Sequence, residues 1–451
     1  MIDLLPLVNK TVEFAYRGAR LGFDLSHALF SSFAIDTGTR LLLKEIAHDE
    51  VITGAASILD AGCGTGIIGI SLAASCPTAK VVMRDRDMLA CAFSERNCWK
   101  NGIPVRRLDF DGKDTAPISK RPPKHKANAE RKNEVIIAPG LLGEDDPFGP
   151  FGAVVSNVPA KAGPRVLSSF IEACAGKLLN PGGRLAFVIV NTLAGLADSW
   201  CSASGMALVR KTVGRSHSVY LLEKPVGGIP ADAAGISAEP LNADILPIPS
   251  FEERSGAVDF YIRSTSKRRI GRYSVQALGF WGLPEFDTTS YATELALEAL
   301  EKATAGSLVR DFLVSGPGIG LAAVWARRTL GPVRIHAVSR DLLSLYATSA
   351  NIKNPESGRP EFLPCHSFDL DSIGPASLDS ILWVPDEIPE YDYILPAWDF
   401  FLRSAKKGAS IVIVSSPTTI ARFEKTRPAG LQRLGEKKKK GFAALMIMKA
   451  C

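Results

Sequence analysis

The chain has 451 residues, of which 46% are hydrophobic and 22% are charged. This length and composition predict several globular domains and exclude a disordered, collagen-like or coiled-coil protein. The total of 53 Lys and Arg against 47 Asp and Glu gives a net charge of +6, which permits an RNA partner but does not require one.

Strand and helix patterns alternate along the first half of the chain. A hairpin is expected over 12–30, followed by a helix over 37–47. Strands are predicted at 56–62, 81–85, 135–139, 153–157, 184–190 and 218–224, with helices at 67–75, 88–102 and 166–179. Continuous apolar strands between amphipathic helices are typical of a mostly parallel α/β sheet covered on both faces. We expect the last two strands to form an antiparallel hairpin at one edge.

The second half of the chain repeats the first. Residues 12–17 (VEFAYR) resemble 258–263 (VDFYIR), and 35–46 resemble 286–300. One constant offset then aligns LDAGCGTG (59–66) with LVSGPGIG (313–320), and a smaller offset aligns NVPA (157–160) with WVPD (383–386). We therefore predict two tandem Rossmann-like domains, 1–225 and 251–451, with an insertion in the first copy.

Two segments have the composition of non-domain regions. Residues 111–134 are rich in Lys, Arg, Pro and Asn without apolar periodicity, which predicts a flexible basic insertion. Residues 226–250 are rich in Gly, Ala and Pro, which predicts a linker.

A glycine-rich loop follows the first sheet strand of the first copy. It reads Asp60-Ala-Gly62-Cys-Gly64-Thr-Gly66, and Asp85 ends the next strand. Glycines at such a position let the backbone approach a ligand and leave helix N–H groups available. The nicotinamide dinucleotide pattern is excluded, because its third glycine would stand where this chain has Ile67. An acid at the end of the second strand suits the two hydroxyls of an adenosine ribose.

This combination resembles the class I S-adenosylmethionine-dependent methyltransferases. The segments FSSFAIDTGTRLLL (30–43) and SHSVYLLEK (216–224) are similar to the methyltransferase small domain family. Known members methylate the exocyclic amine of guanine in ribosomal RNA and carry a duplicated domain with one decayed copy, which comes first in those relatives. The resemblance implies S-adenosylmethionine as cofactor and assigns roles by position: the methionine part to Asp60, Gly62, Cys63, Gly64, Thr65 and Gly66, the ribose to Asp85, and the adenine to Arg86 and Gly140.

The family's target-binding motif usually reads Asn-Pro-Pro-aromatic. This chain has Asn157-Val158-Pro159-Ala160 after the fourth predicted strand. The resemblance implies that Asn157 and the Val158 carbonyl accept the two N–H bonds of the target amine, so that catalysis depends mainly on positioning. The ring that would stack on the base is replaced by Ala160. The alternatives are that Asn157 only caps the strand end, and that Lys161 is solvated instead of contacting substrate phosphate.

The second copy keeps the glycines and loses the polar groups. Asp60, Asp85 and Asn157 correspond to Val314, Ser339 and Trp383. We therefore predict a degenerate, non-catalytic second domain. Its basic runs (266–272 and 437–440) and the rings of Phe280, Trp281 and Trp383 predict RNA contact, while a purely architectural role is the alternative.

Cysteine spacing and hydropathy indicate which kinds of site and which cellular compartment to expect. The eight cysteines form no C-x-x-C pair and have no histidine at ligand spacing, so neither a metal site nor a disulfide framework is expected. The amino-terminal residues lack a secretory pattern, and no apolar run approaches membrane-spanning length. We predict a cytoplasmic S-adenosylmethionine-dependent methyltransferase acting on an exocyclic amine of an RNA base, with ribosomal RNA guanine favoured. A protein or small-molecule methyltransferase, and an idle RNA-binding assembly factor, are the alternatives.

Overall fold

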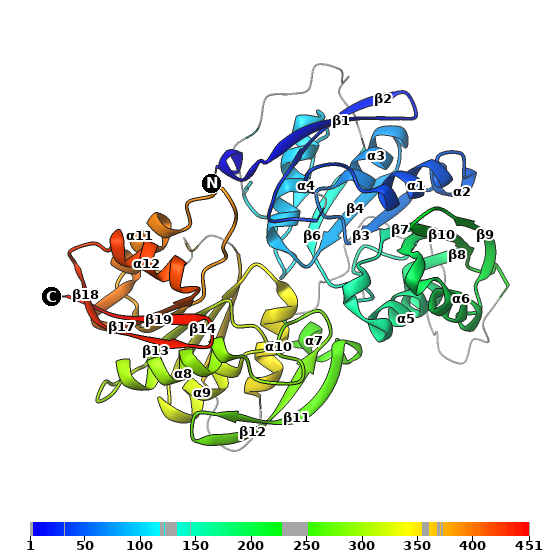
Figure 1. Cartoon of the computed structure of the whole chain (residues 1–451). Helices are drawn as coiled ribbons and strands as arrows, with labels where there is room; N and C mark the ends of the chain where they lie inside the picture. Colours follow the sequence, from blue (N-terminus) through cyan, green and yellow to red (C-terminus); the bar gives the residue numbers. More distant parts are fainter. Residues whose placement is uncertain are drawn as a thin grey trace. The chain divides into compact units, whose positions relative to one another are not determined.

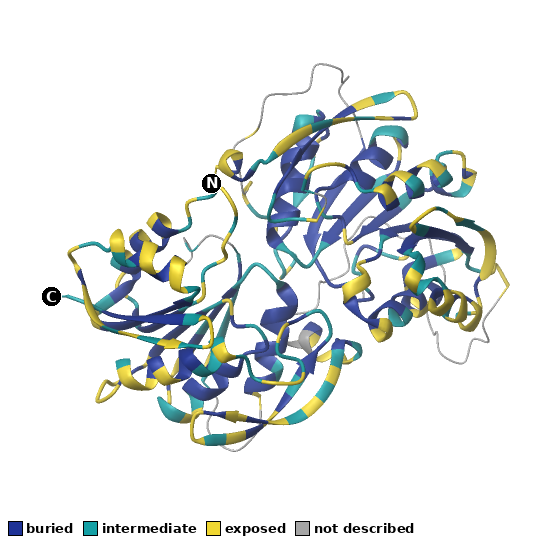
Figure 2. Ribbon diagram, in the orientation of Figure 1, coloured by how far each residue is buried: buried dark blue, intermediate teal, exposed yellow. Residues whose placement is uncertain are grey.

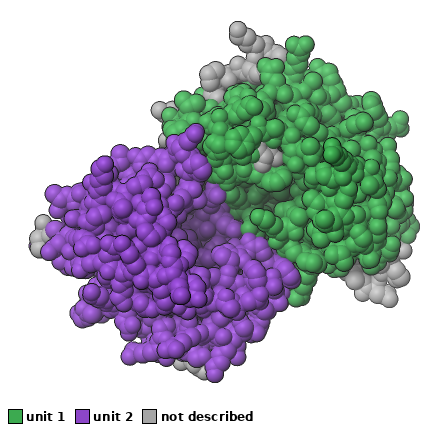
Figure 3. Space-filling model, viewed as in Figure 1, with its two compact units in different colours: residues 1–260 green, residues 261–451 purple. Residues whose placement is uncertain are grey.

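The computed structural model contains two compact units, residues 1–260 and 261–451 (Figure 3). The structure describes residues 3–30, 32–117, 121, 133–144, 146–227, 251–353, 360–367, 370 and 373–450. Of the predicted linker, only residues 226 and 227 are described. Of the predicted insertion, residues 118–120 and 122–132 lie outside the described residues.

The first unit is built on an eight-stranded sheet with the order β5-β6-β4-β3-β7-β8-β10-β9 (Figure 1). Its strands are β3 (Ser57–Ala61), β4 (Lys80–Asp85), β5 (Arg106–Arg107), β6 (Val135–Pro139), β7 (Phe151–Asn157), β8 (Leu179–Val190), β9 (Ala207–Val213) and β10 (His217–Glu223). Only the β8–β10 and β10–β9 pairs are antiparallel. A separate hairpin of β1 (Lys10–Tyr16) and β2 (Ala19–Leu25) precedes the sheet.

Helices cover both faces because the chain leaves the centre of the sheet in two directions. The helices are α1 (Thr37–Ile46), α2 (Glu50–Thr53), α3 (Ile67–Ser75), α4 (Met88–Lys100), α5 (Pro164–Ala173) and α6 (Ala194–Ala203), and a π-helical turn (Cys174–Leu178) follows α5. From β3 the chain proceeds to β4 and β6, and from β7 it proceeds the opposite way to β8. Right-handed crossovers then place α3 and α4 on one face and α5 on the other.

The β1–β2 hairpin covers α4 and makes it a buried helix (Figure 2). The backbone N–H groups of Gly22 and Asp24 donate to the side chains of Asn101 and Asn97. Arg96 on the same helix forms a 2.8 Å ion pair with the buried Asp24 carboxylate. These partners explain how polar residues of α4 can lie in the interior.

The sheet edge differs from the prediction in one respect. β8 and β10, the two strands predicted last, are antiparallel neighbours. However, α6 and β9 lie between them in sequence, and β9 occupies the outer edge. β9 is missing from the prediction because its residues are mostly exposed and show no apolar alternation. The predicted α/β class, with a mostly parallel sheet and an antiparallel edge hairpin, is confirmed.

The second unit repeats this architecture, and its described residues include no strand that corresponds to β5. Its sheet order is β15-β14-β13-β16-β17-β19-β18, and β11 and β12 form the preceding hairpin. The strands are β11 (Ile262–Ile270), β12 (Tyr273–Phe280), β13 (Asp311–Ser315), β14 (Arg334–Ser339), β15 (Glu361–His366), β16 (Leu378–Trp383), β17 (Ala405–Ser415), β18 (Leu431–Lys439) and β19 (Phe442–Lys449). The helices are α8 (Tyr291–Ala303), α9 (Leu321–Thr329), α10 (Leu342–Ile352), α11 (Ile394–Ser404) and α12 (Pro417–Lys425).

Corresponding residues have the same conformations and make the same hydrogen bonds in the two units. Gly66 and Gly320 begin α3 and α9 in the left-handed conformation, with φ of 83° and 88°. The Asn97 side chain donates to the Thr65 carbonyl at 2.9 Å, and Asn351 donates to the Ile319 carbonyl at 2.8 Å. The tandem Rossmann-like fold predicted from the internal repeat is therefore confirmed.

The division between the units falls later than the sequence predicts. Helix α7 (Phe251–Gly256) belongs to the first unit, whereas the second domain was expected to begin at residue 251. The buried Arg254 guanidinium forms a 2.7 Å ion pair with the buried Glu144 carboxylate. Breaking such a buried pair would leave an uncompensated charge in the interior, which explains why this segment packs on the first unit.

Candidate active site

The strand order places the candidate site at the carboxyl ends of β3 and β7. These two strands are parallel neighbours, and the chain leaves them in opposite directions. A crevice at this reversal point is where open α/β sheets bind ligands. The loops that follow β3, β4, β6 and β7 reach this edge, and they carry the residues singled out in the sequence.

The glycine loop leaves open space beside its backbone. Gly62 and Gly64 have φ of 78° and 56°, and among the described residues a Cβ on either would meet no heavy atom within 4 Å. The backbone N–H groups of Gly62 and Cys63 donate to the Arg84 carbonyl on the neighbouring strand, which fixes the loop to the sheet. Gly66 is required for a different reason, because a Cβ there would lie 2.9 Å from the Ser94 hydroxyl.

Asp85 lies beside this loop and orders it. One carboxylate oxygen accepts a 2.9 Å hydrogen bond from the Gly64 N–H, and the other accepts one from the Asp87 N–H, also at 2.9 Å. The side chain is half-buried. These two hydrogen bonds fix the Asp85 carboxylate between the glycine loop and the start of α4.

Arg86 and Gly140 flank Asp85. Arg86 is half-buried, and the Gly140 N–H donates to the Asp85 carbonyl at 3.1 Å. A Cβ on Gly140 would lie 2.0 Å from the Arg84 guanidinium. The structure therefore gives Gly140 a packing role against Arg84, which the sequence did not reveal.

Asp60 is fully buried behind the glycine loop. Its Oδ2 accepts a 2.7 Å hydrogen bond from the Gly69 N–H, while its Oδ1 has no partner among the described residues. Burial raises the pKa of Asp60 to about 7, and the Asp85 charge adds to the rise. A buried acid with an unsatisfied oxygen next to open backbone is a suitable environment for a cationic group.

Asp60 is expected to make the protein less stable as the pH rises. Its pKa is higher in the folded than in the unfolded state, so the folded protein holds the extra proton between about pH 4 and pH 7, and stability falls across that window. Asp60→Asn removes this dependence. In thermal unfolding of the ligand-free protein, the melting temperature of the variant minus that of the wild type should increase from pH 5 to pH 8. A constant difference would show that Asp60 ionises freely.

The other two loop side chains are structural. Thr65 is buried, and its carbonyl holds Asn97. The Cys63 sulfur is buried and lies 3.5 Å from the Ser94 hydroxyl. Burial raises the pKa of the Cys63 thiol well above its usual value, and the Asp85 charge adds to this. Such a thiol is a poor nucleophile.

Asn157 ends β7 with its amide held in one orientation. The Nδ2 atom donates to the Asp36 carboxylate at 3.1 Å and to the Thr39 hydroxyl at 2.9 Å. A carboxylate can only accept, so the NH2 group must face Asp36 and the Oδ1 atom must face the other way as an acceptor. Both Asp36 and Thr39 also shape the start of α1, where Asp36 accepts from the Thr39 N–H. Sequence reasoning missed these two residues, although the repeated segment 35–46 includes them.

The residues after Asn157 present a backbone acceptor and an exposed turn. The Val158 N–H donates to the Val188 carbonyl, and no described group donates to the Val158 carbonyl. Pro159, Ala160 and Lys161 are exposed, and Ala160–Ala162 form a 3-10 turn. The structure thus brings the Asn157 amide and the Val158 peptide together at the end of β7.

In the second unit the space beside the first glycine of the corresponding loop is narrower. A Cβ on Gly316 would lie 3.3 Å from Val384, and the Val384 N–H donates to the Ser315 carbonyl on β13. In the first unit the matching Val158 N–H donates toward β8 instead. Val314 is buried, and Trp383 packs edge-on against Phe401 at 5.2 Å. The loss of polar groups is therefore accompanied by a closer approach of Val384 to the glycine loop.

Some of the side chains considered for RNA contact by the second unit make contacts within that unit. Lys437 and Lys439 pair with the Glu298 carboxylate of α8. Arg268 and Phe280 are buried. Trp281 lies beneath the Arg263 guanidinium at 4.5 Å. The other cations of the two runs, Lys267, Arg269, Arg272, Lys438 and Lys440, are exposed, so RNA contact and an architectural role both stand as alternatives.

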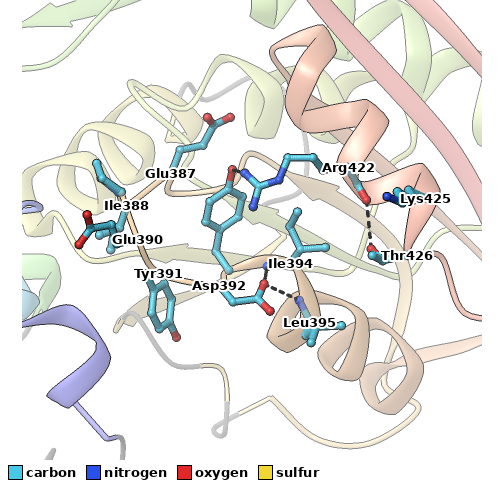
Figure 4. A pocket seen from close by; sticks show the side chains of 12 residues that line it. Glu387, Ile388, Glu390, Tyr391, Asp392, Ile394, Leu395, Arg422, Lys425 and Thr426 are labelled. Atoms are coloured by element: carbon cyan, nitrogen blue, oxygen red, sulfur yellow. Dashed lines mark hydrogen bonds between the residues drawn. The ribbon is translucent and has the colours of Figure 1, made fainter.

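A hollow of about 790 Å³ lies in the second unit between α11 and α12 (Figure 4). Its lining combines carboxylates with cations: Glu387, Glu390, Asp392, Arg422 and Lys425. Arg422 donates to the Tyr393 hydroxyl at 3.2 Å. The mixed charge does not select a polyanion.

Two further searches of the described residues gave negative results. No helix in these ranges is both long and apolar enough to cross a membrane. No cluster of three or more His, Cys, Asp or Glu side chains in the described ranges is arranged to hold a metal ion.

Comparisons with known proteins identify relatives of the first unit. Residues 20–138 match the model of the family described as Methyltransferase small domain. The Ribosomal RNA small subunit methyltransferase C of Pseudomonas fluorescens is 36% identical over 90 residues, which are 20% of this chain and 26% of that protein. The uncharacterized protein YbxB of Bacillus subtilis is 28% identical over 181 residues, which are 40% of this chain and 74% of that protein. The chain thus spans about a quarter of the length of the named Pseudomonas enzyme.

One solved structure matches the whole tandem arrangement. It is the T. thermophilus 16S rRNA N2 G1207 methyltransferase (RsmC) in complex with AdoMet and guanosine, with a TM-score of 0.59 and 18% sequence identity. The match covers 98% of this chain and 99% of that one. At this identity the likeness supports the shared fold of both units.

Proposed function

The chain carries a methyltransferase small domain, and from this premise we propose that its first unit methylates an exocyclic amine of an RNA base. Membership of the S-adenosylmethionine-dependent methyltransferases fixes the enzyme class and the cofactor. Guanine in ribosomal RNA is the favoured acceptor, because the Pseudomonas fluorescens relative and the T. thermophilus structure are named as ribosomal RNA methyltransferases. The proposed setting is the cytoplasm.

The donor side of the site supports this proposal through shape and charge. S-adenosylmethionine supplies an electrophilic methyl group on a sulfonium when it is bound. The open backbone at Gly62 and Gly64 would face the methionine part, with the buried Asp60 carboxylate behind it. Asp85, whose carboxylate lies beside the glycine loop, would accept from the ribose hydroxyls.

The acceptor side of the site supports the proposal because its acceptors would orient the target amine. The Asn157 Oδ1 and the Val158 carbonyl would accept the two N–H bonds of the amine, which directs the nitrogen lone pair toward the methyl group. In-line displacement forms the N–CH3 bond as the S–CH3 bond breaks, and the bonding pair leaves on sulfur. The amine then loses one proton to solvent. Positioning of this kind supplies much of the rate enhancement.

The observation that carries the proposal is the fixed orientation of the Asn157 amide. Its NH2 group is committed to Asp36 and Thr39, so the group offered to a ligand is an acceptor. An amine donor fits this site, whereas a carboxylate or a phosphate acceptor of methyl groups does not.

Transfer of a radiolabelled methyl group tests the function. The full chain is incubated with labelled S-adenosylmethionine and separated RNA, protein and metabolite fractions, and label is expected in RNA. Label only in protein or metabolites would favour a different acceptor, which the missing ring at Ala160 allows. Absence of label in every fraction would favour an RNA-binding assembly factor.

A further inference from the structure

A loop connects the two halves of the candidate active site. Its described residues, 26–30 and 32–36, lie between the end of β2 and the start of α1. At one end, the Asp24 N–H donates to Asn97, whose amide holds the Thr65 carbonyl of the glycine loop. At the other end, Asp36 accepts from the Asn157 amide. The loop therefore spans from the cofactor side to the acceptor side.

This loop presents two phenylalanine rings to solvent. Phe30 is 73% exposed and Phe33 is 64% exposed. An exposed ring forgoes the free energy of burial that Phe gains elsewhere, and both rings lie within six positions of Asp36, whose carboxylate contacts the Asn157 amide. Phe33 is also held in place, because its ring meets the His27 ring edge-on with centroids 5.1 Å apart and planes at 73°.

The motif after β7 contains no aromatic ring, whereas the loop before α1 contains two. Ala160 ends at its Cβ and cannot stack on a base. Phe33 stands three positions before Asp36 and therefore close in the chain to the group that orients Asn157. The Asn9 side chain donates to the Ser32 carbonyl at 2.7 Å and fixes the backbone immediately before Phe33.

We propose that Phe33, oriented by His27, stacks on the target base and replaces the aromatic residue missing at position 160. The inference rests on the proposed function, because it requires a base as the methyl acceptor. Phe30 lacks a described ring contact that would orient it, so Phe33 is the better positioned of the two. The stacked base would place its exocyclic amine at the Asn157 Oδ1.

Methyl transfer kinetics on a guanine-containing single-stranded RNA test the inference. Truncating an aromatic side chain on which a base stacks lowers RNA affinity by roughly tenfold to a hundredfold. Phe33→Ala should raise the KM for RNA by that factor and leave the dissociation constant for S-adenosylmethionine unchanged. Phe33→Trp should restore the KM, while Phe33→Leu, which keeps an apolar side chain without a ring, should not.

Leu208→Ala is a matched control. Leu208 is 53% exposed and lies on the edge strand β9, at a distance from the glycine loop and Asn157. This variant should behave as the wild type. If the wild type methylates the RNA and Phe33→Ala keeps its KM, the stacking role is wrong and the proposed function stands. If the wild type does not methylate RNA at all, both are overturned.

Discussion

Replacing Asp85 with alanine should abolish detectable binding of S-adenosylmethionine to the full chain in isothermal titration. Two charge-assisted hydrogen bonds to the ribose would each contribute about 1.5–3 kcal/mol, so their loss raises the dissociation constant at least about a hundredfold. The variant also removes the acceptor of the Gly64 N–H. Asp85→Asn keeps a neutral acceptor and should bind with intermediate affinity.

The second unit supplies the matched control for this titration. Ser339 stands at the position that corresponds to Asp85, and its hydroxyl accepts from the Asp341 N–H at 3.0 Å, as Asp85 accepts from Asp87. Ser339→Ala should leave both the affinity and the stoichiometry of one site per chain unchanged. Two equivalent sites in the wild type would refute the degenerate second domain, and unchanged binding by Asp85→Ala would refute the role of Asp85.

Asn157→Ala should lower kcat by about a hundredfold to a thousandfold, the range found when one oriented polar group is removed from a transition state. Asn157 is the last residue of β7 and makes no described contact with the glycine loop, so cofactor affinity should not change. The measurement is single-turnover methyl transfer with saturating cofactor. Thr39→Val removes one of the two acceptors that orient the amide and should cost less, about tenfold.

Asn180→Ala is the control for general effects of losing an amide from this sheet. Asn180 lies near the amino end of β8, at the opposite edge of the sheet from the carboxyl ends that form the site. Its removal should leave kcat within about twofold, as is typical of a surface change remote from the chemistry. Full activity of Asn157→Ala would show that Asn157 serves only to cap the strand.

Most of the fold could be predicted because its signals are local. The helix 67–75 was predicted with the bounds that α3 has, since Gly66 can adopt the left-handed conformation and the following residues are apolar. The exposed strand β9 gave no such signal, because an edge strand buries too little on either face to impose alternation. The position of α7 depends on the Arg254–Glu144 pair, which joins residues far apart in the chain.

The candidate site, like the fold, could be predicted in part from the sequence. Its glycines, acids and Asn157 stand out because local sequence sets their backbone conformation and their place at strand ends. The partners Asp36 and Thr39 are over a hundred residues from Asn157 in the chain, and only the packing of α1 brings them to its amide.

The sequence by itself determined that this protein has two related α/β units and that only the first keeps Asp60, Asp85 and Asn157. These features are properties of residue identity and of backbone preference over a few positions. The tertiary structure alone decided that Val384 lies against the glycine loop of the second unit, that lysines 437 and 439 pair with glutamates, and that Phe33 is exposed. Burial and charge pairing arise from contacts between distant segments, which a linear pattern does not specify.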